Sequence, residues 1–327
     1  MGNAITRRAV LAGLAALPAP AVLAQGAAAW PARPVRIVVP FPPGGLVDVL
    51  ARTVSAPLAQ AFGQPFVVEN RAGAGGNIGA DAVAKSAPDG HTLLAASLGP
   101  LAVNQYIYAA MPYDTDTAFA PVVLLATTPK VLCVAQGRPW RDLPALLRDA
   151  RARPRQLTAG SAGAGSSLHL ALELLKGAAG VEIEHVPYRG AAPAVTDLVA
   201  GNIDLLIDNL PNILGQIRGG AVRALATPSA ARLAQLPEVP TMAEAGVPDF
   251  VFGTAFGMAA PAGTPPEILR RVAAAVTEAL RDPAVGGRLA EQGTVLGGGT
   301  PEDFARMIAR EKSTLEPVIR RANIRAE

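Results

Sequence analysis

A pair of glycines stands where an apolar strand is expected to turn into a helix, in the run Pro40-Phe41-Pro42-Pro43-Gly44-Gly45-Leu46-Val47-Asp48. Residues 35–39 are apolar enough for a buried strand, and leucines and a valine recur at helical spacing from 46 to 58. The first N–H groups of a helix have no acceptor within it, and the helix dipole is positive at that end. We therefore expect this turn to face a small anion.

A second turn of the same kind is predicted at Gly160-Ser161-Ala162-Gly163-Ala164-Gly165-Ser166-Ser167. It follows an extended segment, 156–159, and precedes an apolar helix over 168–175. Two anion-binding turns this far apart in the sequence indicate two lobes.

The rest of the chain alternates between strands and helices. The final quarter ends in two amphipathic helices, 265–281 and 301–322, with Thr264 and Thr300 as capping residues. This alternation predicts an α/β fold with mostly parallel sheets. The expected strands are 35–39, 65–69, 92–96, 121–126, 130–135, 182–186, 203–207 and 222–226.

Two segments are candidates for crossings between the lobes. Residues 121–135 read as a strand, a Thr-Thr-Pro break and a second strand, and residues 250–258 form an extended apolar run. Two crossings make a hinge. We expect a discontinuous first lobe, 25–127 with 252–327, and a second lobe, 128–251.

The first 24 residues are typical of a cleaved export signal. Arg7 and Arg8 precede a small apolar stretch that is too short to span a bilayer, and cleavage is expected near Ala24. The paired arginines fit either the twin-arginine or the general export route. We therefore expect an exported protein.

Composition excludes several partners. Removing the signal removes two arginines and no acidic residue, so the formal charge falls from +3 to +1, which indicates neither nucleic-acid nor membrane binding. Cys133 is the only cysteine, so no disulfide is expected. Three histidines without metal-ligand spacing predict no metal site.

Two other readings of the glycine clusters are weaker. Residues 73–79 resemble a dinucleotide fingerprint, but Ile78 occupies the position where that motif needs its third glycine, so a packed turn is favoured. A serine hydrolase would use Ser161 or Ser166 with His169, yet Ala159 stands where the nucleophile elbow needs glycine. Hydroxyls at a helix start bind a carboxylate without reacting with it.

Further polar residues fall at predicted strand ends. Arg189 could pair with a carboxylate or lie in solvent, and Tyr188 could donate a hydrogen bond. Asp208 ends a strand, at a position where ligands bind parallel sheets. Asp48, in the first helical turn, could cap the helix or compensate its dipole, contact an amine or a bound water, or do both.

Together these residues resemble the Bug or TctC family, the periplasmic solute-binding proteins of tripartite tricarboxylate transport. The resemblance covers essentially the whole mature chain. The motifs that carry it are Pro40-Phe41-Pro42-Pro43-Gly44-Gly45 with Asp48, Ala51 and Arg52; Val67-Val68-Glu69-Asn70-Arg71 with Gly73-Ala74-Gly75-Gly76-Asn77-Ile78-Gly79; Pro88-Asp89-Gly90 with Thr92-Leu93-Leu94; Gly160-Ser161 with His169-Leu170; Val186-Pro187-Tyr188-Arg189-Gly190; and Pro261-Ala262-Gly263-Thr264-Pro265.

The resemblance implies a two-lobed, type II-like periplasmic binding protein that closes on a small carboxylate and passes it to a membrane permease. A dicarboxylate, a tricarboxylate, an acidic amino acid or an aromatic acid would fit. It implies no cofactor and no catalysis, and we expect a monomer. The ligand-binding residues carried over are Phe41, Gly44, Gly45 and Asp48 from the first lobe and Ser161, Gly163, Gly165 and Ser166 from the second, with Ser97, Thr128, Tyr188, Arg189 and Asp208 on the cleft wall.

One departure from the family bears on the ligand. Leu46 and Val47 stand where relatives commonly carry smaller or hydroxylated residues, which predicts a less polar or bulkier carboxylate. An exported sensor that signals to a receptor, and a hydrolase, stay open as alternatives.

Overall fold

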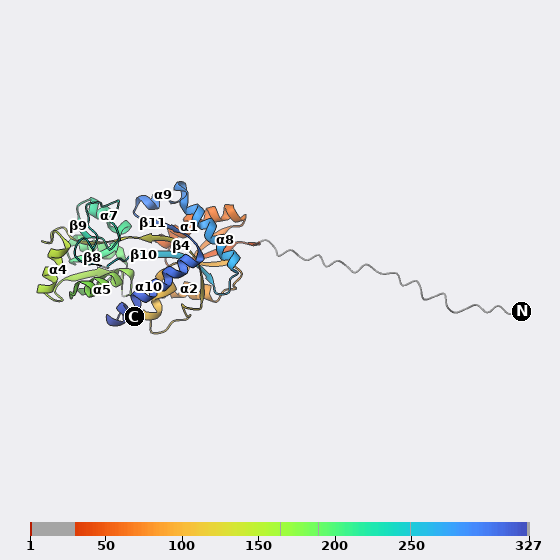
Figure 1. Cartoon of the computed structure of the whole chain (residues 1–327), viewed down its shortest axis with the longest axis horizontal. Helices are drawn as coiled ribbons and strands as arrows, with labels where there is room; N and C mark the ends of the chain where they lie inside the picture. Colours follow the sequence, from red (N-terminus) through yellow and green to blue (C-terminus); the bar gives the residue numbers. More distant parts are fainter. Residues whose placement is uncertain (2–29, 164, 189, 249, 326–327) are drawn as a thin grey trace.

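A computed structural model describes residues 30–163, 165–188, 190–248 and 250–325, together with Met1. The predicted signal beyond Met1, residues 2–24, and Arg189 lie outside the described residues. Within the described part, none of the helices combines the length and apolar character needed to cross a membrane. Figure 1 shows two bodies side by side, one coloured mostly green and the other holding the orange and light blue elements, with the dark blue C-terminal helix lying along both.

The first sheet has six strands in the order β11-β4-β10-β3-β1-β2. It contains both the beginning and the end of the chain. Its strands are β1 (Val35–Val39), β2 (Phe66–Asn70), β3 (Thr92–Ser97), β4 (Phe119–Thr128), β10 (Thr254–Pro261) and β11 (Val295–Gly298).

The second sheet has five strands in the order β7-β6-β8-β5-β9. All of them come from the middle of the chain. They are β5 (Lys130–Ala135), β6 (Thr158–Ser161), β7 (Glu184–Pro187), β8 (Leu205–Asn209) and β9 (Val222–Ala226).

Both sheets are mixed, which corrects the expectation of mostly parallel sheets. In the first sheet, β1 pairs in parallel with β2 and β3, whereas β10 is antiparallel to its neighbours β3 and β4. In the second sheet, β6 pairs in parallel with β7 and β8, whereas β5 is antiparallel to its neighbours β8 and β9. The reason is the hinge: β5 and β10 each begin just after a crossing and run away from it. The carboxyl ends of the parallel strands therefore face the region between the sheets, where ligands bind α/β folds.

The helices flank both sheets, and one short π-helical segment, η2 (Gly99–Val103), follows β3. A 3₁₀ turn, η1 (Ala74–Gly76), precedes α2. The α-helices are α1 (Leu46–Phe62), α2 (Asn77–Ala84), α3 (Asn104–Ile107), α4 (Leu143–Ala152), α5 (Ser167–Ala179), α6 (Ala191–Ala200), α7 (Leu210–Arg218), α8 (Pro266–Arg281), α9 (Pro283–Glu291) and α10 (Pro301–Arg321).

Strand alternation assigns each face of the first sheet to a different core. Val35, Ile37 and Val39 of β1 pack with α1 and α8, whereas Val38 joins a second core on the other face. That second core continues into the other lobe and includes Phe304, Leu315 and Ile319 of α10. Helix α10 (dark blue in Figure 1) therefore packs against both lobes.

The two predicted tail helices are present, but only one has the expected cap. Thr300 and Asp303 form a capping box at the start of α10. Thr264 does not cap α8: its hydroxyl donates to the Pro261 carbonyl at 2.7 Å, and Pro265 holds the N-cap position. The Thr264 side chain satisfies the preceding turn instead of the helix.

The chain passes between the sheets at two adjacent places. β4 ends at Thr128 and β5 begins at Lys130, while the returning strand β10 starts at Thr254, which pairs with Thr128. The predicted domain boundaries, 127/128 and 251/252, stay a prediction.

The aromatic ring of Phe304 anchors α10 on the first sheet. It is buried and lies directly over Gly257 of β10, where a Cβ would come 2.1 Å from the ring. We expect Phe304→Ala to lower the free energy of unfolding by about 3–5 kcal/mol, because it leaves a cavity in a core shared by two elements. Denaturant unfolding measures this, and Val295→Ala, at an exposed position, is the control with an expected change under about 0.5 kcal/mol.

Candidate functional site

A cavity of about 320 Å³ lies between the two lobes. Its lining comes from the first lobe, the hinge strand β10, helix α5 of the second lobe and helix α10. The lining residues are Phe41, Gly75, Ser97, Leu98, Gly99, Val103, Asn104, Ile107, Tyr108, Ala162, Gly165, Ser166, Ser167, Leu170, Phe252, Gly253, Thr254, Ala255, Glu311 and Leu315.

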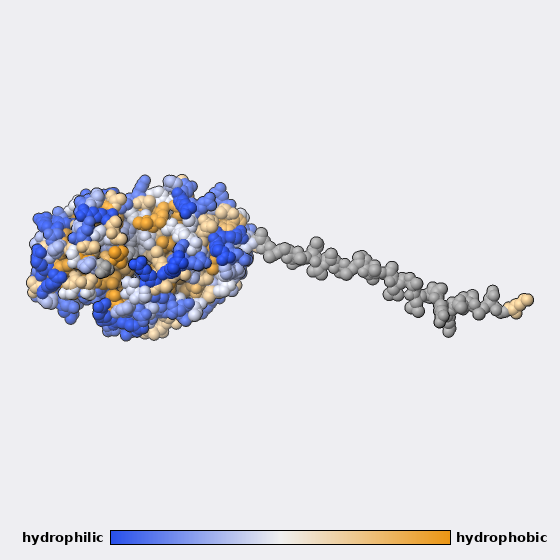
Figure 2. All heavy atoms as spheres, viewed as in Figure 1, coloured by the Kyte–Doolittle hydropathy of each residue, from blue (hydrophilic) through white to orange (hydrophobic). Residues whose placement is uncertain are grey.

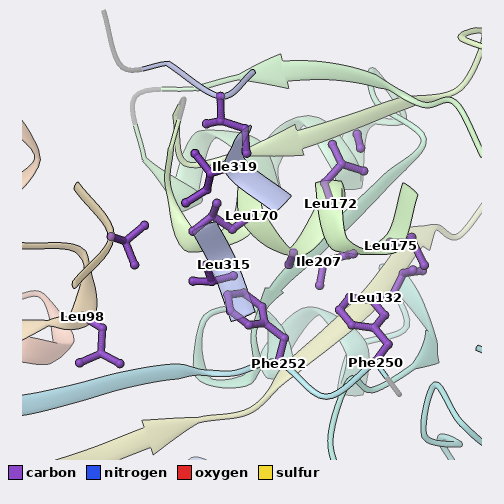
Figure 3. Close-up of a cluster of buried hydrophobic side chains, with 14 of the residues drawn as sticks. Leu98, Leu132, Leu170, Leu172, Leu175, Ile207, Phe250, Phe252, Leu315 and Ile319 are labelled. Carbon is purple, nitrogen blue, oxygen red and sulfur yellow. The ribbon is translucent and has the colours of Figure 1, made fainter. Parts of the chain in front are cut away.

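Part of the cavity wall is apolar. Figure 3 shows Leu170 of α5, Leu315 of α10 and Phe252 close together, with Leu98 of the first lobe set apart from them. These side chains belong to the buried core that spans both lobes. They provide a surface for a hydrocarbon portion of a ligand.

The start of α5 is the polar part of the wall. Ser166 is the N-cap, and its hydroxyl accepts from the N–H of His169 at 3.3 Å. The other N–H groups of a first helical turn have no acceptor within the helix. With the hydroxyl of Ser167 beside them, they form a polar end of the cavity whose N–H groups suit an anion.

Two stacked histidines hold the turn that leads into α5. The rings of His169 and His185 lie 3.8 Å apart between centroids, and burial lowers the pKa of His185 to about 4. The Gly165 N–H donates to Nδ1 of His169 at 3.1 Å, and Ser161 Oγ lies 2.6 Å from Nε2 of His185. Ser161 is fully buried and is not part of the cavity lining, so it fixes the turn from behind.

Four predicted site residues line the cavity: Phe41, Ser97, Gly165 and Ser166. The others are placed differently. Gly44, Gly45 and Asp48 lie on the turn after Phe41, outside the lining; Gly163 lies in the turn before α5; Thr128, Ser161 and Asp208 are buried; Tyr188 donates to Asp197 at 2.6 Å; and Arg189 is outside the described residues. Their contact with a ligand stays a prediction.

Asp48 braces the first glycine turn. Its buried carboxylate accepts from the Gly44 N–H at 3.0 Å, from Arg52 Nε at 3.0 Å and from Asn70 Nδ2 at 2.9 Å. Asn70 also donates to the Phe41 carbonyl at 3.1 Å. The hydrogen bond from Arg52 is the largest cause of a pKa of about 2 for Asp48, ahead of the opposing effect of burial.

The reason given for a less polar ligand was wrong. Val47 is buried in the core under α1, and Leu46 packs against the same core, so neither lines the cavity. Both occupy the inner face of α1, where apolar residues are needed for packing.

The sequence analysis missed most of the cavity wall. Ile107, Leu170, Phe252 and Leu315 read only as core residues, and nothing in the pattern of the last helix indicated that Glu311 would reach the cleft. It also missed Lys130, a fully buried lysine at the hinge. A lone charge in an otherwise apolar strand was the signal that could have found it.

Within the described residues, no three histidine, cysteine or acidic side chains come together as they would around a metal ion.

Sequence comparison assigns most of the chain to one family. The profile described as "Tripartite tricarboxylate transporter family receptor" matches residues 50–324. The chain is 46% identical over 317 residues to the "UPF0065 protein in tcbD-tcbE intergenic region" of Pseudomonas sp. (strain P51), covering 96% of this chain and 94% of that protein. It is 42% identical over 292 residues to protein BugT of Bordetella pertussis, covering 89% and 90%.

Solved structures agree. The fold matches R. palustris Rpa4515 with adipate at a TM-score of 0.80 and 41% identity, covering 90% of this chain and 99% of that one. It matches MatC from Rhodopseudomonas palustris with bound malate at a TM-score of 0.77 and 35% identity, covering 88% and 99%.

The brace formed by Asp48 predicts a dependence of stability on pH. Because folding lowers its pKa from 3.8 to about 2, its contribution is complete above pH about 4 and is lost as the pH falls through 2. We expect Asp48→Asn to destabilise the protein by about 1–2 kcal/mol at pH 7. Urea unfolding from pH 7 down to pH 2.5 measures this, and the difference between the two proteins should shrink as the pH falls.

The turn at Gly45 can be tested without disturbing the fold. Its backbone is extended, at φ −74° and ψ 164°, and the nearest atom to an added Cβ would be 3.8 Å away. We expect Gly45→Val to leave the melting temperature unchanged and to weaken carboxylate binding, because the side chain blocks the approach to the N–H groups. Gly137→Val, at another unobstructed position, is the control, and unchanged affinity in Gly45→Val would place the ligand away from this turn.

Proposed function

Because this chain belongs to the tripartite tricarboxylate transporter receptor family, the Bug or TctC solute-binding proteins, we propose that it captures a small carboxylate between its lobes and delivers it to a membrane permease. The observation that carries the proposal is the pairing, in one interlobe cavity, of a helix start bearing two serines with an apolar wall. The first part suits a carboxylate and the second a hydrocarbon chain.

The ligand class follows from the composition of the wall. We propose a carboxylate with an apolar segment, since leucine, isoleucine, valine and phenylalanine side chains make up a continuous part of the wall beside its polar residues. The R. palustris structure with adipate supports a chain of methylene groups in such a site. Each methylene that leaves water contributes about 0.8 kcal/mol.

Binding without chemistry is the use that the geometry favours. A hydrolase would use Ser161 or Ser166 with His169. Ser161 is sealed behind the turn, Ser166 Oγ accepts from the backbone N–H of His169 as the helix cap, and Nδ1 of His169 accepts from the Gly165 N–H. Closure of the lobes on a ligand that touches both would stabilise the form that a permease recognises. A receptor could read the same closed form. We propose that this takes place in the periplasm, after removal of the signal.

Calorimetric titration of the mature chain with a panel of acids tests the proposal. We expect adipate to bind at least about tenfold more tightly than malate, because more methylene surface is buried against the apolar wall. Native mass spectrometry of the gently purified protein adds an independent readout of any acid that it carries. A chain that binds no member of a panel of aliphatic, aromatic and hydroxy acids would contradict the proposal.

Ser166→Ala localises the site. We expect about a tenfold loss of adipate affinity, because the variant removes a hydroxyl from the cavity wall and loosens the start of α5. The matched control is Thr300→Ala, which removes an equivalent helix cap at the start of α10 and should leave affinity unchanged. Equal effects of the two substitutions would mean that the cap, and not the ligand, is being measured.

A further inference from the structure

Lys130 is a fully buried cation at the hinge, and the function derived above does not use it. It is the first residue of β5, one residue beyond Pro129 at the first crossing. Its ammonium donates to Ser167 Oγ at 3.1 Å and to Asn209 Oδ1 at 2.8 Å. The other lysines, Lys85, Lys176 and Lys312, pair with acidic side chains.

Its hydrogen bond sets the direction in which Ser167 can donate. Burial lowers the pKa of Lys130 to about 7, so the group is an ammonium below that pH. An ammonium has no lone pair, so Ser167 Oγ then accepts from it, and the hydroxyl proton is left for another acceptor. Thr254 Oγ1 lies 3.1 Å from Ser167 Oγ and 2.9 Å from Asn209 Oδ1. An amide oxygen can only accept, so the Thr254 hydroxyl donates its hydrogen bond to Asn209 Oδ1. Ser167 can then donate either to Thr254 or to a ligand in the cavity that it lines.

The acidic side chain in the cavity wall opposes the binding of an anion, and Lys130 is placed to offset it. Among the described lining residues the one charged side chain is Glu311, an acid that burial holds at a pKa of about 7, with Lys130 acting in the opposite direction. An incoming carboxylate would meet the ionised fraction of Glu311, and none of the described lining residues carries a positive charge; Lys130 and Arg310 act on Glu311 from outside the lining. Lys130 stands one hydrogen bond behind the wall at Ser167, close enough to influence Glu311.

We propose that Lys130 is a positioning residue for the ligand: it holds Ser167 as a donor into the cavity and supplies the positive charge that offsets the ligand carboxylate and Glu311. The inference deepens the proposed function and rests on it. It makes the anionic group of the ligand, rather than its hydrocarbon part, the feature that Lys130 recognises through Ser167.

A purely structural role would make Lys130 the counter-charge of Asp208. Asp208 is fully buried, and its Oδ1 accepts from the Asn209 N–H at 2.6 Å and from Asn212 Nδ2 at 3.0 Å. No hydrogen bond joins it to Lys130, whose two bonds go to Ser167 and Asn209. Asp208 still acts on Lys130 through its charge, which raises the pKa of Lys130 against the effect of burial. The hydrogen bond to Ser167 leads to the cavity wall, so Lys130 also faces the ligand site.

The test compares adipate with adipamide, its uncharged diamide, in calorimetric titrations at pH 6, where Lys130 is mostly protonated and adipate is still an anion. We expect Lys130→Met to weaken adipate by about 10- to 100-fold and adipamide by less than about threefold, because only the anion needs the charge. Lys85→Met, which removes an exposed lysine of α2's C-terminal end, is the control and should leave both affinities unchanged.

Four further variants separate positioning from folding. Ser167→Ala should cost a similar factor, and the Lys130→Met/Ser167→Ala double variant little more than either alone, because the two residues act in series. Glu311→Gln should strengthen adipate binding, the opposite of the effect expected for Lys130→Met and Ser167→Ala, because it removes negative charge from the cavity wall. Lys130→Met combined with Asp208→Asn keeps the buried charges balanced, and the loss of adipate affinity should persist.

The outcomes are distinct. If Lys130→Met lowers the melting temperature but binds adipate as tightly as the wild type, or if adipate and adipamide weaken equally, the inference is overturned and the proposed function stands. A wild-type chain that binds none of the acids overturns both. Should Lys130→Met not fold, Ser167→Ala and Glu311→Gln decide. Ser167→Ala must weaken and Glu311→Gln must strengthen the binding of adipate, and neither should change the affinity for adipamide to the same extent.

Discussion

The pairing of Thr128 with Thr254 holds the two crossings side by side, and the positions of both lobes depend on it. Asn209 at the end of β8 accepts from Thr254 and from Lys130, so the polar groups of the hinge are satisfied where the chain leaves one sheet for the other. Because buried backbone and side-chain groups must find partners, this network restricts how the lobes can meet. The cavity lies immediately beside it.

Helix α10 complements the hinge. Its Phe304 packs on the first sheet, and Leu315 and Ile319 belong to the same core as side chains of the second lobe. One helix therefore contributes to stability and to the binding wall. On the face shown in Figure 2, hydrophilic residues cover most of the surface and hydrophobic residues form scattered patches, so the larger apolar clusters of the chain lie inside.

Local sequence patterns predicted most of the elements because their causes are local. The glycine pair before Leu46, the capping box at Thr300 and the apolar strands each act through neighbouring residues. Thr264 failed as a cap because an acceptor in the preceding turn, the Pro261 carbonyl, took its hydroxyl. Leu46 and Val47 were misread for a related reason: the direction in which a helix presents its side chains depends on what packs against it.

By itself, the sequence determined the alternation of strands and helices, the two glycine-rich turns and the family resemblance, since all of these are written in short segments. Only the tertiary structure decided which of the predicted residues share a cavity. It brought Phe41, Ser97, Gly165 and Ser166 together, sealed Ser161 behind the turn, and added Phe252, Glu311 and Leu315 from distant segments. Such contacts join residues that are far apart in the chain, and they are fixed by the packing of whole elements across the hinge, which no local pattern records.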